Sequence, residues 1–386
     1  MKKILLIAAL PLLLTGCTSP SLFRDTDSPA VTSYVQGNPF PPSETLAVTG
    51  ETPLNFRNQV GVWLPYMHFE DYMSGKTADE FRQAVHSMLD DYKAQDVNTV
   101  YFHAHPCGDA YYDSDIFPKG VYLDGDYDPL AIVTEEAHSI GISLHAWINP
   151  LRCQTQEQMD SLPDDFIIKK WLYDPECSCV KLVGSRYYLD PAYTEVTELV
   201  CRCAEEILEK YPVDGIHIDD YFYPSTDPEF DRTEFERSGS ADLSLWRQEN
   251  CTRLVKSLCD TVKIHGDGFV FGISPQGNIS ADYETQYADV RLWSGSKDYC
   301  DYIVPQIYFG FKNAACPFEA TLKQWEELTS GSEVSLIIGL AAYKTGKEDK
   351  WAGVAGQDEW INDPDIISRQ TELVKQSSAD GYALYY

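Results

Sequence analysis

Short apolar runs alternate with longer amphipathic segments along most of this chain. Eight runs have the length and the β-branched or aromatic content of buried strands. They span residues 60–64, 99–105, 143–149, 215–219, 269–274, 302–308, 335–340 and 381–385. The segments between them, such as 79–95 and 192–210, repeat apolar residues every three or four positions, as amphipathic helices do. This alternation predicts a parallel α/β fold.

Eight repeats favour a (β/α)8 TIM-like barrel over a doubly wound sheet, because no glycine-rich phosphate loop follows the first strand. The extra length lies in the loops after the second, third, fourth and seventh strands, all at the C-terminal face. The chain stops at Tyr386, directly after the eighth strand, so the last helix is missing from the predicted barrel. We expect either that the sequence is a fragment or that the N-terminal linker fills that groove.

The first residues are typical of a targeting segment. Lys2 and Lys3 precede an apolar run, residues 4–14, which is too short to span a membrane. The following Leu14-Thr15-Gly16-Cys17 resembles a bacterial lipobox, so residues 1–17 are predicted to be a lipoprotein signal peptide with Cys17 as the lipidated residue. The lipid would hold the protein, outside the cytoplasm, on the outer face of a bacterial membrane.

The next segment, residues 18–56, is rich in Ser, Thr, Pro and Asp and has no periodicity, which predicts a flexible linker. The predicted barrel occupies residues 57–386.

Composition narrows the choice of partners. The formal net charge of -30 argues against nucleic acid, whose binding requires clustered Lys and Arg. Aromatic residues make up 13% of the chain and offer flat apolar faces for sugar rings. Ten cysteines remain besides Cys17, two pairs of them in C-x-C spacing rather than the C-x2-C of zinc ribbons, and we expect mostly reduced, structural roles.

The fourth predicted strand points a carboxylate into the barrel. Side chains alternate across a strand, so Ile216 and Ile218 face the helices while His217 and Asp219 face inward. The same argument applied to the other strands gathers a set of polar and aromatic groups at one rim. These are Trp63, His103, His105, Trp147, Asn149, Asp219, Gln306 and Tyr308. Such convergence at the C-terminal face of a barrel predicts an active site, although each residue taken alone could fill the core.

Several motifs resemble the glycosyl-hydrolase-like family 10 of bacterial envelope proteins, over residues 58–386. They are Gly61-Val-Trp63, Asn98-Thr-Val-Tyr-Phe102, His145-Ala-Trp-Ile-Asn-Pro-Leu-Arg152, Leu189-Asp-Pro191, Asp214-Gly-Ile-His-Ile-Asp-Asp-Tyr-Phe-Tyr-Pro224, Gly272-Ile-Ser-Pro275 and Asp301-Tyr-Ile-Val-Pro-Gln-Ile-Tyr308. The resemblance implies a TIM-like barrel and a glycosidase. It also implies cell-envelope polysaccharide as substrate, in particular peptidoglycan glycan strands.

Glycoside hydrolysis usually needs one ionised and one protonated carboxyl. We expect Asp219 to be the ionised member. Asp220 can be its partner only if the strand ends between them, and Asp109, Asp113 and Glu229 are other candidates. Substrate binding is expected from Trp63, His103, His105, Trp147, Asn149, Arg152, Tyr221, Tyr223, Gln306 and Tyr308. Neither a metal nor a cofactor is expected.

Two alternatives remain open. His103 and His105 lie on one strand face and, with Asp219, could ligate a metal in an amidohydrolase or polysaccharide deacetylase. A non-catalytic glycan-binding lipoprotein would keep the aromatic rim without turnover.

Overall fold

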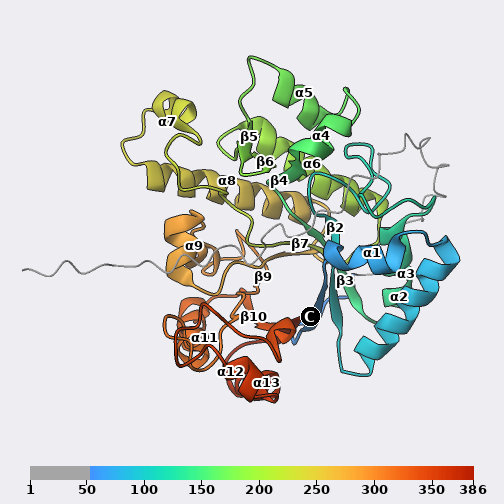
Figure 1. Cartoon of the computed structure of the whole chain (residues 1–386), viewed down its shortest axis with the longest axis vertical. Coiled ribbons are helices and arrows are strands. Elements are labelled where there is room, and N and C mark those ends of the chain that lie inside the picture. Colours follow the sequence, from blue (N-terminus) through green and yellow to red (C-terminus); the bar gives the residue numbers. More distant parts are fainter. Residues whose placement is uncertain (1–52) are drawn as a thin grey trace, which may run out of the picture.

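The computed structural model describes residues 53–386, and these form a closed barrel of eight parallel strands (Figure 1). The barrel order is β1-β11-β10-β9-β8-β7-β3-β2. The strands are β1 (Val60–Leu64), β2 (Thr99–His105), β3 (Ser143–Ile148), β7 (Gly215–Ile218), β8 (Val270–Ile273), β9 (Tyr302–Ile303), β10 (Ser335–Ala341) and β11 (Gly381–Tyr385). The predicted (β/α)8 barrel is confirmed. The predicted signal peptide, Cys17 and most of the predicted linker lie outside the described residues.

Helices cover the outside of the barrel, as Figure 1 shows. The longer ones are α2 (Ala78–Lys93), α3 (Pro129–Ser139), α6 (Thr194–Lys210), α8 (Leu243–Ile264), α11 (Phe318–Thr329) and α13 (Ile366–Gln376). The shorter ones are α1 (Phe69–Met73), α7 (Arg232–Ser238), α9 (Ile279–Thr285), α10 (Val290–Trp293) and α12 (Glu359–Asn362). Local sequence fixes their starts: Thr77 and Glu80 form a reciprocal capping box at α2. Within residues 53–386, none of these helices combines the length and apolar character needed to cross a membrane.

A small antiparallel sheet is inserted after β3 and was not predicted. It contains β4 (Arg152–Thr155), β5 (Val180–Val183) and β6 (Arg186–Leu189), in the order β4-β6-β5. Helices α4 (Gln156–Ser161) and α5 (Ile167–Tyr173) complete this insertion, which forms the upper part of Figure 1. Strands of only four residues are too short to show the alternation that identifies a strand. The sheet pairs Arg152 of β4 with Tyr188 of β6.

The sixth barrel strand is shorter than predicted. β9 ends at Ile303, because Pro305 has no N–H to donate to a neighbouring strand. Beyond it, the carbonyl of Pro305 accepts from the amide of Gly339, and the amide of Gln306 donates to the carbonyl of Pro275. The chain therefore remains attached to both neighbouring strands without regular ladder geometry.

A chain of hydrogen bonds fills the barrel interior. The Trp63 indole donates to His217 Nε2 (3.1 Å), and the opposite nitrogen of His217 meets the Tyr302 hydroxyl (3.0 Å). This hydroxyl also meets His145 Nδ1 (2.6 Å), and His145 Nε2 meets Asn55 Oδ1 (3.0 Å). Burial lowers the pKa of His145 to about 4 and that of His217 well below its usual value, so both rings are neutral.

The N-terminal end of the described chain closes the barrel floor. The Leu54 amide donates to Asp214 Oδ1 (2.6 Å), and the Asn55 side chain donates to the carbonyls of Asp214 and Gly268. The last residues assigned to the linker, which was predicted to end at 56, therefore belong to the fold. Periodicity did not identify them because they form neither a strand nor a helix.

Candidate active site

Asp219 lies directly beyond the end of β7, at the mouth of the barrel. Its Oδ2 accepts a hydrogen bond from the Trp147 indole on β3 (3.1 Å), and its Oδ1 accepts from the Tyr221 amide (3.3 Å). The side chain is 3% exposed. Asp219 is therefore aimed inward across the barrel, as the alternation of β7 predicts.

Asp220 also faces the mouth, because β7 ends at Ile218 and the chain turns there. Its Oδ1 accepts a hydrogen bond from the Gln306 side-chain amide (3.2 Å), and Gln306 is itself held by the carbonyl of Ser274 (3.1 Å). One carboxyl is thus held from β3 and its neighbour from the segment after β9. The condition under which Asp220 can act with Asp219 is met.

Burial and mutual repulsion perturb both carboxyls. Burial, and then the charge of Asp220, raises the pKa of Asp219 well above its usual value. Burial raises the pKa of Asp220 to about 6, although the donors on Gln306 and Gln286 oppose the shift. Asp220 is half-buried and the more accessible of the two. Burial therefore disfavours the ionised form of both carboxyls, and that of Asp219 more strongly.

Arg152 brings positive charge to the same mouth. Its guanidinium lies 4.9 Å from the centre of the Tyr221 ring and 5.7 Å from that of Tyr66. The field of Arg152 lowers the pKa of both aspartates and so partly offsets their burial. Tyr66 and Tyr221 are half-buried, so part of each ring remains accessible beside the carboxyls.

His103 and Asn149 support the mouth from β2 and β3. The His103 ring stacks on Trp147 at 3.6 Å, and Asn149 Nδ2 donates to His103 Nε2 (3.3 Å). His103 is buried, which lowers its pKa well below its usual value and keeps it neutral. His105 lies past a register shift in β2 and packs against Phe117 (4.2 Å). The His103 ring, which Asn149 holds by a hydrogen bond, therefore keeps Trp147 in place.

Three residues expected to bind sugar lie in packed surroundings. Trp63 is 3% exposed and packs between Tyr101, His217 and Tyr385 inside the barrel. Tyr308 is buried against Tyr343 and Tyr385.

Tyr223 is the third of these residues, and it lies away from the pair of carboxyls. Its hydroxyl accepts from Asn250 (3.2 Å), and its ring packs on Phe230 and Tyr287. The ring is buried among these neighbours, and its expected stacking role stays a prediction.

The other acid candidates are held elsewhere. Asp113 lies beside the C-terminal part of α6, where its carbonyl accepts from Lys210 Nζ (3.0 Å). Glu229 is exposed and pairs with Arg232. Asp109 is 4% exposed and accepts from the Cys107 amide (2.9 Å), while burial raises its pKa to about 6. Of the four candidates, Asp220 is the one whose charge raises the pKa of Asp219, whereas Asp109 shares with this pair the field of Arg152.

The structure also shows partners that the sequence did not reveal. Gln286 hydrogen-bonds Asp220, and the charge of Asp220 contributes to the raised pKa of the fully buried Asp282. Asp282 Oδ1 accepts from the Gln276 amide (3.1 Å). Both residues belong to the segment after β8, where α9 and its C-cap carry no strand alternation that could have pointed to them.

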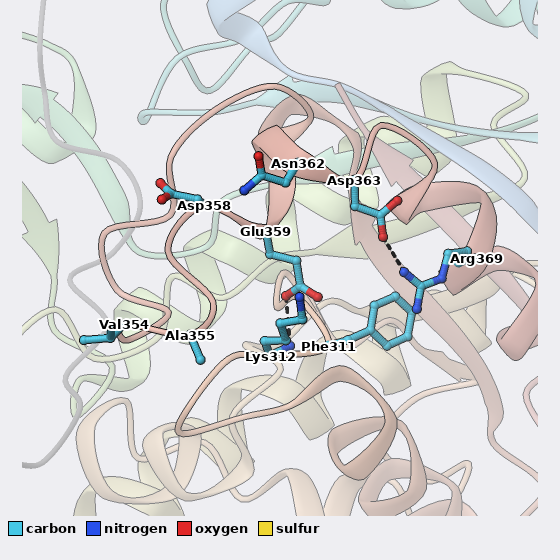
Figure 2. Close-up of a pocket in the computed structure, with 9 residues that line it drawn as sticks. All are labelled: Phe311, Lys312, Val354, Ala355, Asp358, Glu359, Asn362, Asp363 and Arg369. Carbon is cyan, nitrogen blue, oxygen red and sulfur yellow. Dashed lines mark hydrogen bonds and ion pairs between the residues drawn. The ribbon is translucent and has the colours of Figure 1, made fainter.

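A recess lies in the loops that follow β9 and β10, at the C-terminal ends of these parallel strands. Figure 2 shows the side chains that line it. Its volume is about 340 Å³, and it is lined by Phe311, Lys312, Val354, Ala355, Asp358, Glu359, Asn362, Asp363 and Arg369. Glu359 accepts from the Lys312 amide (2.8 Å), and the Arg369 guanidinium covers Phe311 at 4.4 Å. Hydrogen-bond donors, hydrogen-bond acceptors and small apolar surfaces thus line the same recess.

The metal-ligand set considered from the sequence does not assemble. Within residues 53–386, the ligand atoms of His103, His105 and Asp219 do not all lie within 4.8 Å of one another. The stacking of His103 on Trp147 and the packing of His105 on Phe117 account for their separate orientations.

Comparison with known proteins identifies the family. The family model described as glycosyl hydrolase-like 10 matches residues 58–353. The glycosyl hydrolase YngK of Bacillus subtilis is 31% identical over 348 residues, which cover 82% of this chain and 66% of that protein. The glycosyl hydrolase DigH of Escherichia coli K12 is 31% identical over 297 residues, covering 70% and 67%. The chain thus spans about two thirds of the length of these relatives.

Solved structures share the architecture. The glycoside hydrolase domain of PgaB (BpsB) from Bordetella bronchiseptica aligns with a TM-score of 0.58 and 14% identity, covering 86% of this chain and 94% of that one. An α-L-fucosidase isoenzyme from Paenibacillus thiaminolyticus aligns with a TM-score of 0.53 and 15% identity, covering 85% and 46%. The chain belongs to the glycosyl hydrolase-like 10 family, and its barrel has the fold of glycoside hydrolases.

Proposed function

We propose that this protein is a glycosidase of cell-envelope polysaccharide, with peptidoglycan glycan strands as its substrate. The observation that carries this proposal is the pair of adjacent carboxyls, Asp219 and Asp220, held at the barrel mouth by donors from β3 and from the segment after β9. Their raised pKa values match the requirement for one protonated and one ionised carboxyl.

We assign the proton to Asp219 and the charge to Asp220. Asp219 is the more deeply buried, and its raised pKa suits a general acid that protonates the leaving oxygen. Asp220 is more accessible and ionises at about pH 6, so it can stabilise positive charge developing on the sugar or activate a nucleophile. Trp147 and Gln306 fix the two carboxyls and so reduce the reorganisation needed in the transition state.

Recognition of the glycan falls to the accessible groups at the mouth. Tyr66 and Tyr221 offer ring faces for stacking, and Gln306 can hydrogen-bond a hydroxyl or an acetamido group. Arg152, which lies over both rings, is 4% exposed and contributes positive charge behind this stacking surface. The recess of Figure 2 lies at the same end of the barrel and can accept a sugar remote from the scissile bond.

Charge and targeting support an envelope substrate. A net charge of -30 disfavours association with anionic wall polymers and favours glycan strands without acidic peptides. The lipobox around Cys17 would keep the enzyme on the outer face of a membrane, next to such strands.

The test is incubation of the full chain with purified, peptide-free peptidoglycan strands, followed by mass analysis of the products. We expect shorter oligosaccharides with new reducing ends, and none from the Asp219→Asn variant. If the wild-type protein binds the strands but releases no fragments from any wall glycan, it is a glycan-binding protein and the enzymatic proposal fails.

A further inference from the structure

Two cysteines in the segment that leads into β5 of the inserted sheet lie in contact with each other. The sulfur atoms of Cys177 and Cys179 are 3.0 Å apart. Ordinary non-bonded contacts between heavy atoms are about 3.5–4.0 Å, whereas the two sulfurs of a disulfide are about 2.05 Å apart. The pair is therefore closer than packing alone requires. We propose that Cys177 and Cys179 form a disulfide, which makes the segment before β5 an oxidation site of the protein.

The backbone holds both thiols on one side of the chain. Residues 177–179 lie between a turn at 175–176 and β5, and they form neither a helix nor a regular strand. A turn fixes Cys177, whose amide donates to the Asp174 carbonyl (3.1 Å), and the Asp190 amide donates to the Cys179 carbonyl (2.8 Å). Both ends of the short segment are thus anchored, so the sulfurs remain close.

The second C-x-C pair shows that the spacing alone does not bring two sulfur atoms together. Cys201 and Cys203 have the same spacing, but they lie in α6, where residues two apart project in different directions. Cys203 Sγ instead contacts the Tyr112 hydroxyl (3.4 Å). Of these two pairs with equal spacing, the sulfur–sulfur contact of 3.0 Å belongs to the one in the irregular segment before β5.

A metal ion bound by both cysteines explains the sulfur–sulfur contact less well than a disulfide does. In the part of the chain that the structure describes, no third carboxylate, imidazole or thiolate gathers with both sulfurs within 4.8 Å. The charge of Asp190 acts on the Cys179 thiol, and Asp190 is itself paired with Lys181, which also meets Glu234. Two sulfurs without a third ligand favour covalent pairing.

The oxidant is a disulfide such as glutathione disulfide, and Cys177 is the point of entry. Cys177 is half-buried, whereas Cys179 is 1% exposed and burial raises the pKa of its thiol. The Cys177 thiolate attacks one sulfur of glutathione disulfide and releases one glutathione. Cys179 then loses its proton to water and attacks the Cys177 sulfur, releasing the second glutathione. Two protein thiols become one disulfide, and one glutathione disulfide is reduced to two thiols.

Trypsin provides a direct readout. It cleaves after Lys170 and Lys181 and releases Trp171–Lys181, which contains Cys177, Cys179 and no other cysteine. The full chain is equilibrated with glutathione disulfide, quenched in acid, unfolded, treated with iodoacetamide and digested. We expect this peptide without alkyl groups and lighter than the dithiol by two hydrogen atoms, whereas prior reduction should give two alkyl groups.

The second C-x-C pair is the internal control, because cleavage after Arg202 separates Cys201 from Cys203. We expect both of these cysteines to be alkylated. Repeating the equilibration in urea tests the contribution of the fold: the Cys177–Cys179 disulfide should be at least tenfold more stable against glutathione in the folded protein. Two alkyl groups under oxidising conditions, a retained glutathione adduct, a link to another cysteine, or equal stability in urea would each overturn the proposal.

Discussion

The indole of Trp147 donates a hydrogen bond to the carboxyl of Asp219 across 3.1 Å. The indole ring cannot follow a movement of the carboxyl, because His103 stacks on it at 3.6 Å. This contact therefore fixes the orientation of the carboxyl at the end of β7 from the neighbouring strand β3.

Removing this donor should impair catalysis more than folding. The Trp147→Phe variant retains a ring against His103 but leaves Asp219 without its inward partner, and a misplaced group can cost roughly 100-fold in rate. We expect kcat on peptide-free strands to fall by about that factor. Trp293→Phe is the matched control, since that indole donates to Thr252 outside the mouth. An equal fall in both variants would contradict the assigned role.

Amide variants of the two aspartates should separate their roles. Asp219→Asn cannot donate a proton, so we expect a loss of about 10³-fold on natural strands and a much smaller loss on aryl glycosides whose leaving groups need no protonation. Asp220→Asn should lose activity on both. The measurement is the rate of each variant on the two substrates. The opposite pattern would show that Asp220, and not Asp219, is the general acid.

Gln306 should set the acid limb of the pH profile. Its side-chain amide donates to Asp220 and favours the ionised form, whose pKa lies at about 6. In Gln306→Leu the ionised form loses this donor, so its pKa rises and the acid limb of kcat/KM moves to higher pH. If the acid limb does not move and only KM changes, Gln306 binds the substrate and does not affect the ionisation of Asp220.

The raised pKa of Asp220 also predicts a stability effect. A carboxyl whose pKa rises on folding, from 3.8 to about 6, stabilises the fold only while protonated, below about pH 4. This contribution is lost as the pH rises through about 6. We expect Asp220→Asn to be more stable than wild type at pH 7, by roughly 1–2 kcal/mol, and nearly equal at pH 4. Urea unfolding at both pH values measures this, and a gain confined to pH 4 would contradict it.

A buried ion pair should hold the loop after β7. The Arg247 guanidinium donates to both oxygens of Asp231 (2.6 and 2.9 Å), both side chains are fully buried, and Tyr223 lies 5.2 Å away. Arg247→Met leaves a buried carboxylate without its partner, so we expect a loss of about 3–5 kcal/mol in the free energy of unfolding. The double variant with Asp231→Asn should recover part of that loss. A double variant as unstable as the single one would show that packing, rather than charge, dominates.

Strand alternation predicted the barrel and the inward aim of Asp219 because each barrel strand buries one face against helices. It failed where the backbone leaves a regular strand. The turn after Ile218, which brings Asp220 to the mouth, and the irregular segment around Pro305 both depend on contacts between distant residues. Gln286 and Asp282 were missed for the same reason.

The alternation of apolar and polar residues also did not predict which side chains of the site are buried. Tyr221 and Tyr223 share a face in any extended segment, but Tyr221 remains beside Arg152, whereas Tyr223 packs under the loop with Asn250. The protonation state of Asp219 likewise depends on how completely its neighbours exclude water, which only the packed structure reveals.

The hydrogen bonds inside the barrel have one consistent polarity from Trp63 down to Asn55. Each imidazole donates at one nitrogen and accepts at the other, so no formal charge resides on this column of side chains. The barrel interior therefore places no charge beneath the two carboxyls. Substitutions in the surrounding loops can then change the pKa values of these carboxyls without altering the strands of the barrel.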